Sequence, residues 1–437
     1  MERHRRTLWT LWRRQAQATA QPNRLVPGDE PVHRSRTAPR PGAAVQQSAG
    51  ISIGSITVTS SGGVSRLSPS APIRDQPAST ADLARQLRPL LPPEAFRTDP
   101  NRLALVLINL AILLLGWAMA AHLDRWPGLW PLAFLPFALV MGNSVIMLLF
   151  ASHDMLHGNG TGGAGGRLLR QLVAMLGLGV MWMPPTLWQA VHNREHHSNT
   201  NSLADPDRSY LESQPDTWGK RIQHLFTPSD SVQPLWLLVG MASAWGVHNV
   251  RTLLSVLLVK DGTADFPPAA FQIKRRDRRR IALELLAIAA LHGAVVLWIG
   301  LQPLPLLLGY FLPLWIGYGG AMAYIYTNHL LCPLTETNTP LTNTLSLQMP
   351  PILDVLHLNF SHHTEHHIFP GLNSSYYPLV RRLLLEHHPD QYQLLEGTEA
   401  WRLLLSTPRH YRDAQTLVNW SGDRSAPVPL PQAANGG

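Results

Sequence analysis

Four long apolar runs constrain what this chain can fold into. Each run contains at most one charged residue and is long enough to cross the hydrocarbon core of a bilayer as a helix. The connections at 122–131 and 302–303 are so short that the runs must pair as two hairpins. The sequence therefore predicts an all-α integral membrane protein with four transmembrane helices in two hairpins. The runs are 103–121, 132–151, 281–301 and 304–326.

Two further apolar stretches are less continuous. The stretch 172–188 is interrupted by Met183-Pro184-Pro185, and the stretch 235–258 contains His248 and Arg251 near its middle. A charged side chain inside a membrane span is costly. We therefore expect both stretches to form interfacial or re-entrant helices instead of spans.

The positive charge of the chain lies almost entirely at its beginning. The net charge is +8, but residues 1–80 hold eleven Arg against four acidic residues and account for +7 of it. Nucleic-acid binding calls for basic residues gathered on a folded face, so we expect no nucleic-acid partner. We predict a disordered, basic, Pro/Ser-rich tail over 1–80, a membrane domain over 81–390, and a partly disordered C-terminal extension over 391–437.

The same charges predict the orientation in the membrane. Five arginines between 275 and 280 precede the third apolar run, and the Arg-rich tail precedes the first. The two loops on the opposite side carry one arginine between them, Arg125. Since Lys and Arg accumulate on the cytoplasmic side, both termini and the segment 152–280 are predicted to be cytoplasmic, with a helical cap on that face.

Histidine is the residue type that carries the chemistry. The chain has 20 His but one Cys, Cys332, so disulfides within the chain and cysteine-based metal sites are excluded. Three His clusters occur, at 153–157, 192–197 and 362–367. All three fall on the predicted cytoplasmic side, next to the membrane.

The spacings within the clusters predict metal binding. His153 and His157 are four residues apart, so on a helix they share a face and can bind one ion; His192 and His196 repeat this spacing. Adjacent histidines differ by about 100° around a helix and could serve two ions. So many neutral nitrogen ligands suit two redox-active iron ions, and iron keeps coordination positions open for O₂. The eight expected ligands are His153, His157, His192, His196, His197, His363, His366 and His367.

Further candidates surround these eight. His329, just after the fourth run, is either a ninth ligand or a residue that caps the helix end. The acid in each cluster either accepts a ring N–H from a ligand or binds metal itself. These acids are Asp154, Glu195 and Glu365; Asn328 and Asn359 are candidates to hold a metal-bound water, and His362 is an alternative to His363.

The boxes HDMLH, HNREHH and HHTEHH, with the last continuing as HHTEHHIFPGLN, resemble those of the integral-membrane fatty acid desaturases, especially the bacterial members. The resemblance covers roughly 101–390. It implies two irons held by the eight histidines and His329, and insertion of a cis double bond into a fatty acyl chain with O₂ as co-substrate. It also implies the bacterial inner membrane.

The partners implied by this resemblance are of two kinds. The substrate would be a fatty acyl lipid, an acyl-CoA or an acyl carrier, drawn from or near membrane lipid. No His-Pro-Gly-Gly haem motif occurs in the chain, so two electrons would come from an external ferredoxin or b-type cytochrome.

Two other functions are compatible with parts of the pattern. A carotenoid or alkane hydroxylase or ketolase uses a similar diiron site and shares the His-Asp-x-x-His spacing; the end of the third box favours the acyl desaturase. A His-rich metal transporter would place its ligands near the middle of the bilayer, whereas these boxes lie at its face.

Overall fold

The computed structural model describes residues 78–97, 99, 101–158, 163–226, 234–259 and 266–429. The tail predicted over 1–80 lies outside the described residues apart from its last three positions. The end of the predicted C-terminal extension, 430–437, lies outside them as well.

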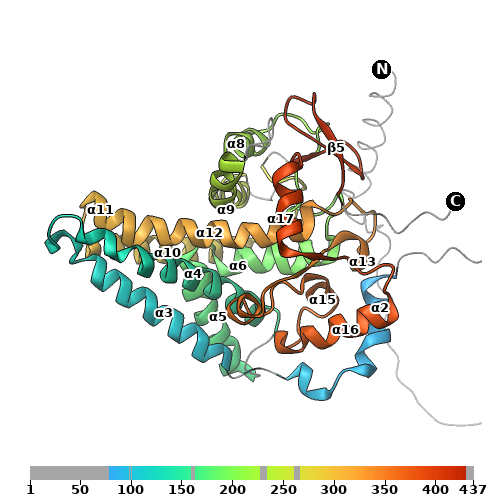
Figure 1. The fold of residues 1–437 in the computed structure, drawn as a ribbon, viewed down its shortest axis with the longest axis horizontal. Helices are drawn as coiled ribbons and strands as arrows, with labels where there is room; N and C mark the ends of the chain where they lie inside the picture. The colour runs from blue at the N-terminus through green and yellow to red at the C-terminus, as the bar shows by residue number, and fades with distance from the viewer. Residues whose placement is uncertain are drawn as a thin grey trace, which may run out of the picture. The chain divides into compact units, whose positions relative to one another are not determined.

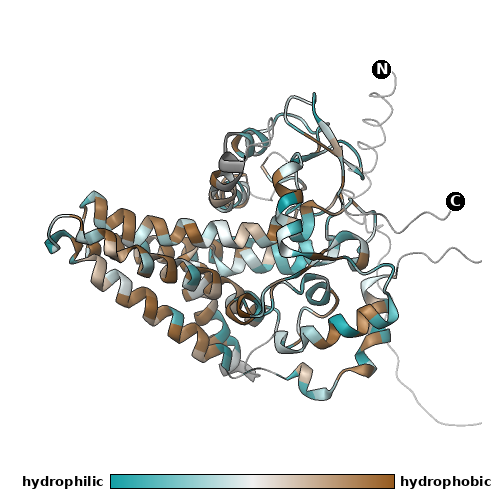
Figure 2. Ribbon diagram, viewed as in Figure 1, coloured by the Kyte–Doolittle hydropathy of each residue, from teal (hydrophilic) through white to brown (hydrophobic). Residues whose placement is uncertain are grey.

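The four predicted spans are confirmed. Within the described residues, four helical segments are long and apolar enough to cross a membrane: Asn101–Arg125, Trp130–Leu156, Arg275–Ile299 and Pro303–Leu330. They lie side by side in Figure 1, and Figure 2 shows their predominantly hydrophobic composition. Their elements are α3 (Asn101–Ala120), η3 (Leu123–Arg125), η4 (Trp130–Phe134), α4 (Leu135–Leu156), α10 (Arg275–Ile299), α11 (Pro303–Leu306), η6 (Leu307–Phe311), α12 (Leu312–Ile325) and η7 (Tyr326–Leu330).

Glycines allow α4 and α12 to pack closely. A Cβ on Gly317 would overlap the Val145 side chain, and one on Gly142 would lie 2.5 Å from Cγ2 of Ile316. Since lipid tails are as apolar as Leu, helices in a membrane associate through such close packing and not through burial of apolar surface from water. This contact joins the two hairpins and brings the end of α4, with the first His cluster, close to the end of α12.

The first of the two less continuous stretches, which were predicted to be interfacial or re-entrant, is a bent pair of helices. The segments Gly166–Val180 and Pro185–Asn199 meet at 97°, as in a broken span or a re-entrant loop. The turn between them is held by side chains: His292 Nε2 lies 2.9 Å from the carbonyl of Gly179, and Trp245 Nε1 donates to the carbonyl of Met181 at 2.8 Å. Its elements are α5 (Gly163–Val180) and α6 (Pro185–Trp188), both labelled in Figure 1. They are followed by η5 (Gln189–His196) and α7 (His197–Asn199).

The second less continuous stretch forms α9 (Pro234–Leu257), which packs on α8 (Trp218–Phe226) and on α12. It is not among the four described helices that meet the length and hydropathy of a span.

A separate apolar cluster holds the third His box. Ile368 and Phe369 at the end of α15 (His363–Ile368) pack with Leu83 and Leu87 of α2 (Thr80–Leu87) and with Val380 of α16 (Tyr377–His387). Ser79 caps α2 by accepting from the backbone N–H of Asp82. Residues near the start and near the end of the described chain therefore fix α15 from two sides.

The remaining elements are short. β1 pairs with β2 in parallel, with Ser346 opposite Leu394; β3, β4 and β5 form an antiparallel sheet with His410 opposite Val418 and Leu417 opposite Ala426. They leave the fold mostly helical, as predicted. Their bounds are η1 (Arg88–Leu90), η2 (Pro93–Phe96), α13 (Pro340–Asn343), β1 (Ser346–Gln348), α14 (Pro351–Leu356), η8 (Ser374–Tyr376), β2 (Leu394–Glu396), α17 (Gly397–Ser406), β3 (His410–Tyr411), β4 (Thr416–Val418) and β5 (Ser425–Pro427).

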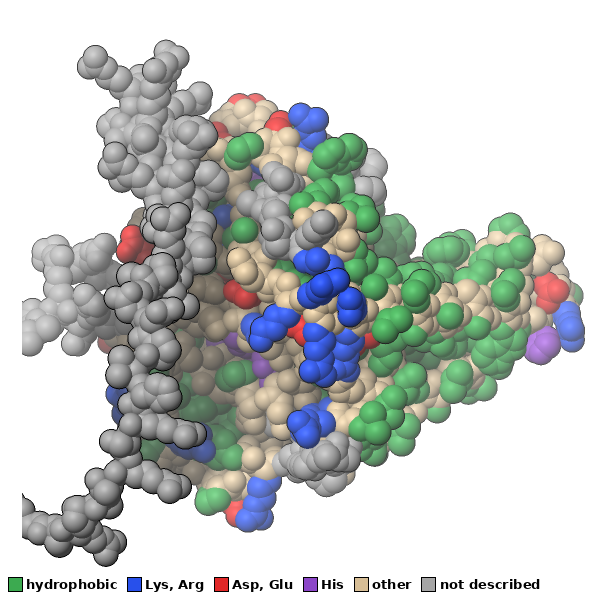
Figure 3. Space-filling view, turned by 180° about the vertical axis from the view of Figure 1, so that it is seen from behind, with side chains coloured by type: hydrophobic (Ala, Val, Ile, Leu, Met, Phe, Trp, Pro, Cys, Tyr) green, Lys and Arg blue, Asp and Glu red, His purple; other side chains and the backbone are tan. Residues whose placement is uncertain are grey.

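The surface divides along the spans. Figure 3 shows hydrophobic side chains covering the long helices and a group of Lys and Arg side chains where these helices meet the rest of the fold. Leu107, Leu286 and Leu297 are each more than half exposed, as expected for side chains that face lipid. Lys274 and Arg275 at the start of α10 are exposed and lie at the edge of this apolar surface.

Replacing Gly177 with Ala should destabilise the fold. A Cβ there would overlap Ser152 Oγ and lie 2.8 Å from the backbone carbonyl of Leu148 on α4, so α5 would have to move. Overpacking of this kind costs about 1–3 kcal/mol. We expect a lower thermal midpoint for the detergent-solubilised variant, measured by loss of its monodisperse chromatographic peak on heating.

Gly179→Ala is the matched control on the same helix, because its Cβ would meet Ile288 at an ordinary 3.5 Å. Equal thermal midpoints for the two variants would contradict the close packing of α5 on α4.

Candidate metal centre

Five elements bring nine histidines together. His153 and His157 lie at the end of α4, and the second box is divided between η5 and α7. His329 comes from η7 and the third box from α15. The nine rings are those of His153, His157, His192, His196, His197, His329, His363, His366 and His367, the full set of predicted ligands.

A first group of imidazoles surrounds one point. The ligand-type nitrogens of five histidines all lie within 4.8 Å of one another. His192 Nε2 lies 3.0 Å from Nε2 of His153 and 3.2 Å from Nε2 of His197, which is 3.2 Å from Nε2 of His366. These separations match those of neighbouring ligands on one ion with bonds of about 2.1 Å. The group comprises His153, His157, His192, His197 and His366.

A second group lies beside the first. His196, His329 and His367 place ring nitrogens within 4.8 Å of one another. His363 Nε2 joins them, at 2.7 Å from Nε2 of His329 and 3.1 Å from Nε2 of His367. Nine imidazoles thus form two sets, of five and four.

The second box pairs its histidines differently from the sequence expectation. His192 and His196 were expected to share one ion, but His192 belongs to the first group with His197, and His196 to the second. The reason is that η5 is a π-helix, which hydrogen-bonds from i to i+5 and so brings residues five apart onto one face. The doublets 196–197 and 366–367 do divide between the two groups.

Hydrogen bonds at Nδ1 orient several rings. His196 Nδ1 lies 2.9 Å from Oδ2 of Asp205, and His366 Nδ1 lies 3.0 Å from the hydroxyl of Tyr377. His153 Nδ1 is 3.3 Å from Oδ1 of Asp154. Such partners fix which nitrogen faces an ion. Two further contacts lie at the second group. Thr200 Oγ1 is 3.1 Å from His367 Nδ1, and the backbone carbonyl oxygen of Asn343 is 3.4 Å from His329 Nδ1.

Asp154 is itself held by a buried arginine. Arg102, at the start of α3, places a guanidinium nitrogen 3.6 Å from Oδ2 of Asp154 and is 3% exposed. It also donates to Ser374 Oγ. The first span is thereby connected to His153 of the first group through one carboxylate.

The remaining predicted site residues lie elsewhere. Glu365 accepts from Ser346, Arg381 and Tyr392, and not from an imidazole. The Glu195 side chain makes no hydrogen bond or ion pair with any described residue. Asn359 Nδ2 donates to the carbonyl of Ser374, and His362 Nδ1 faces Ser361 Oγ, outside both groups. Asn328 is fully buried, and neither of its amide atoms has a hydrogen-bond partner among the described residues.

Sequence reasoning missed the acids that contact the second box. Asp205 and Asp207 follow His196 by nine and eleven residues, and Asp207 Oδ2 lies 3.9 Å from Nδ1 of His192. The motif Asp205-Pro206-Asp207 was a usable signal, because two acids around a proline indicate a rigid turn. Tyr377 and Asn343 carried no such signal.

Burial determines the protonation states in this site. Desolvation, followed by the charges of neighbouring imidazoles, holds the pKa of His366 and His367 well below its ordinary value. Burial alone would raise the pKa of Asp205, but His196 and backbone amides outweigh it and lower that pKa. Burial raises the pKa of Asp207 to about 6. The rings of His366 and His367 are therefore neutral at pH 7, the form that binds a metal ion.

The nine histidines fit a pair of metal ions. His157 Nε2 is buried within the first group and has no hydrogen-bond partner among the described residues. An unpartnered buried nitrogen is costly unless a ligand occupies it. The donors are nitrogen throughout, since the single Cys332 is buried and in neither group. Neutral imidazole suits iron.

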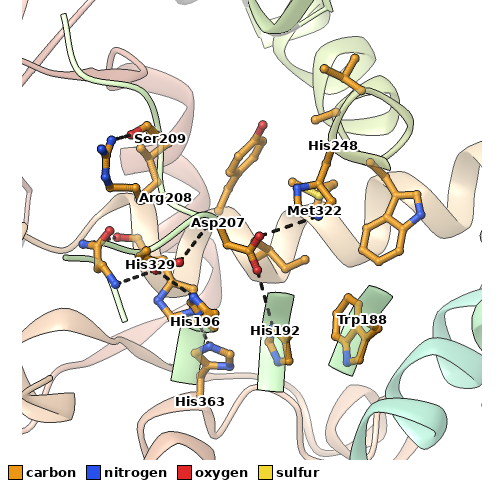
Figure 4. Close-up of a pocket in the computed structure, with 18 of the residues that line it drawn as sticks. Trp188, His192, His196, Asp207, Arg208, Ser209, His248, Met322, His329 and His363 are labelled. Carbon is orange, nitrogen blue, oxygen red and sulfur yellow. Dashed lines mark hydrogen bonds and ion pairs between the residues drawn. The ribbon is translucent and has the colours of Figure 1, made fainter. Parts of the chain in front are cut away.

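A cavity opens beside the two groups. It holds about 1090 Å³ of space, part of it open to solvent, and histidines of both groups line it (Figure 4). One part of its wall is apolar and aromatic, formed by Leu149, Phe150, Trp188, Ala244, Trp245 and Met322. Such a wall suits a hydrocarbon chain lying next to the metal centre.

The family model described as fatty acid desaturase matches residues 127–397. The chain belongs to the fatty acid desaturase family. The matched range contains all nine histidines and the acids Asp205 and Asp207, but not Arg102. No curated protein matches the chain. Membership makes the chain an oxidoreductase acting on fatty acyl substrates, and its apolar helices make it a membrane protein.

Replacing Asp205 with Asn should weaken metal binding. The carboxylate that accepts from His196 Nδ1 would become an amide, and losing such a partner typically reduces metal affinity about 10–100-fold. We expect less iron per protein in the purified variant, measured by elemental analysis. Glu195→Gln is the matched control, since Glu195 lies inside the box but contacts no imidazole; iron loss equal to that of Asp205→Asn would contradict the assignment.

Replacing Tyr377 with Phe removes one hydroxyl while keeping the ring that packs under α15. His366 would lose its Nδ1 partner at 3.0 Å. We therefore expect the variant to lose iron to a chelator faster than the wild type, and the absorbance of the iron chelate measures this rate. Tyr376→Phe, one residue earlier with no side-chain hydrogen bond among the described residues, should lose iron at the wild-type rate. Identical rates for all three proteins would rule out an orienting role for Tyr377.

Proposed function

We propose that this protein introduces a cis double bond into a fatty acyl chain at a pair of histidine-bound irons. The observation that carries the proposal is the position of two imidazole groups along one cavity with an apolar wall. Family membership supplies the reaction class.

The proposed reaction balances with one molecule of O₂. The R–CH₂–CH₂–R′ segment loses two hydrogens, O₂ accepts four electrons, and two protons and two electrons enter from outside to give R–CH=CH–R′ and two waters. The irons, when bound, would supply the O₂ chemistry that an unactivated C–H bond requires. The two external electrons would come from a ferredoxin or a b-type cytochrome.

The chain's own residues would position the reactants. His153, His157, His192, His197 and His366 would hold one iron, and His196, His329, His363 and His367 the other. Trp188 stacks on the ring of His192 with centroids 4.4 Å apart and lines the cavity, so it would keep a ligand in place while contacting substrate. The apolar wall would bind the chain and exclude water from the reacting carbons. Asn328, buried with its amide unpartnered, could hold a water beside the second group.

We further propose the location of the domain. The five arginines at 275–280 and the basic tail favour a cytoplasmic cap, with both termini cytoplasmic and the spans in the bacterial inner membrane. The catalytic domain would cover 81–390, with 1–80 and 391–437 as extensions.

Expression in a host with a known lipid composition tests the reaction. We expect new unsaturated acyl chains by gas chromatography with mass spectrometry, and none from His366→Ala or His196→Ala, both with reduced iron but normal membrane levels. His122→Ala, an exposed histidine in the first hairpin loop, should keep full activity.

Other products would contradict the proposal in distinct ways. Hydroxylated or keto products would indicate a carotenoid or alkane hydroxylase or ketolase. Bound zinc without iron, and function without O₂, would indicate a metal transporter. Retained turnover in either ligand variant would count against the metal centre itself.

A further inference from the structure

The cavity has a polar end that the double-bond chemistry does not use. Besides histidines of the two groups, its wall includes Arg208, Arg251 and Gln223 together with Asp207 and His248. Figure 4 shows Asp207 between His192 and His248. The cavity wall therefore contains both aromatic rings and two guanidinium groups.

One helix contributes both aromatic and cationic side chains to the cavity wall. α9 contributes Trp245, His248 and Arg251, spaced by three residues, so all three lie near one face. Six residues of helix cover about 9 Å. A ligand lying along α9 would meet an indole ring at one end and a cation at the other.

Arg251 is buried with no carboxylate in direct contact, and the charge of Asp207 acts on it only from a greater distance. It is 5% exposed, and no carboxylate oxygen lies within 4.0 Å of its guanidinium among the described residues. Its polar contacts are neutral: it donates to Gln223 Oε1 at 3.0 Å and faces His248 Nδ1 at 3.2 Å, and it lies 5.4 Å from the centre of the Tyr210 ring. Its Nε is buried without a hydrogen-bond partner.

Of the other charged groups of the wall, Arg208 and Asp205 each have several hydrogen-bond partners, whereas Asp207 Oδ1 has none among the described residues. Arg208 donates to the carbonyls of Ser209, Leu203 and Pro268 and to Gln214. Asp205 accepts from His196 and from backbone amides. Asp207 lies 3.9 Å from His192 and 3.8 Å from His248. Arg251 is thus the cation in this wall with the fewest acceptors, although a guanidinium has five N–H donors.

A buried cation that has no carboxylate in contact is costly unless a ligand supplies the opposite charge. We propose that Arg251 binds the anionic head group of the acyl substrate, so that the natural substrate is a chain ending in a carboxylate or a phosphate held inside the cavity. This inference rests on the proposed function, because it names the substrate class of the same site.

Quenching of tryptophan fluorescence tests the inference without turnover. The iron-loaded protein is placed in nanodiscs of uncharged phosphatidylcholine at pH 8 under anaerobic conditions. A dibrominated C18 fatty acid and its methyl ester serve as probes, since bromine quenches nearby indoles and Trp188 and Trp245 line the cavity. We expect the acid to quench at a mole fraction at least about tenfold lower than the ester.

Three variants locate the effect. Arg251→Gln should remove the preference for the acid while leaving the ester curve unchanged, which also shows that the cavity is intact. Arg251→Lys should keep a preference for the acid, because it keeps the charge. Arg221→Gln makes the same charge change at an exposed position on α8 and should behave as wild type. Unbrominated hexadecanoate and hexadecyl phosphate, used as competitors, distinguish the two head groups.

Equal quenching by acid and ester in the wild type would overturn the inference. So would a preference that persists in Arg251→Gln, or a loss of ester quenching in that variant, which would assign Arg251 to packing of α8 on α9. The result is independent of the proposed reaction: a hydroxylated product with an intact preference for the acid would contradict the desaturase and support the anionic head group.

Discussion

The structure depends on the packing of nine imidazole rings into two adjacent groups with little access to water. Rings this close cannot all carry a proton, because like charges in a buried site repel strongly. Burial and neighbouring imidazoles hold the pKa of His366 and His367 well below its ordinary value, whereas Asp205 outweighs burial and raises the pKa of His196. To share a site, the rings must turn their Nε2 atoms toward common points. The surrounding polar residues meet this requirement: Asp205, Asp154 and Tyr377 contact Nδ1 atoms and leave Nε2 free.

The elements that carry the rings are adapted to this task. η5 and η7 are π-helical where they carry His192, His196 and His329, and a π segment changes the direction of side chains without ending the helix. α15 is a single short helix, and an α-helical turn suffices to direct His363 and His367 to one group and His366 to the other. The local helix type therefore decides which of the two groups each histidine joins.

Polar side chains of the membrane helices contact residues that position the candidate metal centre. Arg102 at the start of the first span contacts Asp154, which contacts His153. His292, within the third span, holds the turn that precedes the second box. These polar side chains lie inside or at the ends of apolar helices, where they are costly unless satisfied, and each is satisfied by a group that positions the site.

The sequence by itself determined the spans, because each apolar run of about twenty residues is long enough to cross a bilayer. It also indicated imidazole as the main ligand type, because one Cys excludes cysteine-based sites and three His boxes occur. It also indicated two ions, from the number of histidines and the doublets. Only the tertiary structure decided the pairing of His192 with His197, since the spacing alone cannot distinguish an α-helix from a π-helix. It also supplied the contacts of Asp205 and Tyr377 with the imidazoles, and the place of Arg251 in the cavity wall. Those contacts join residues that are far apart in the chain, or depend on a π-helical turn in place of an α-helical one. Tertiary packing produces them, and no local sequence pattern encodes it.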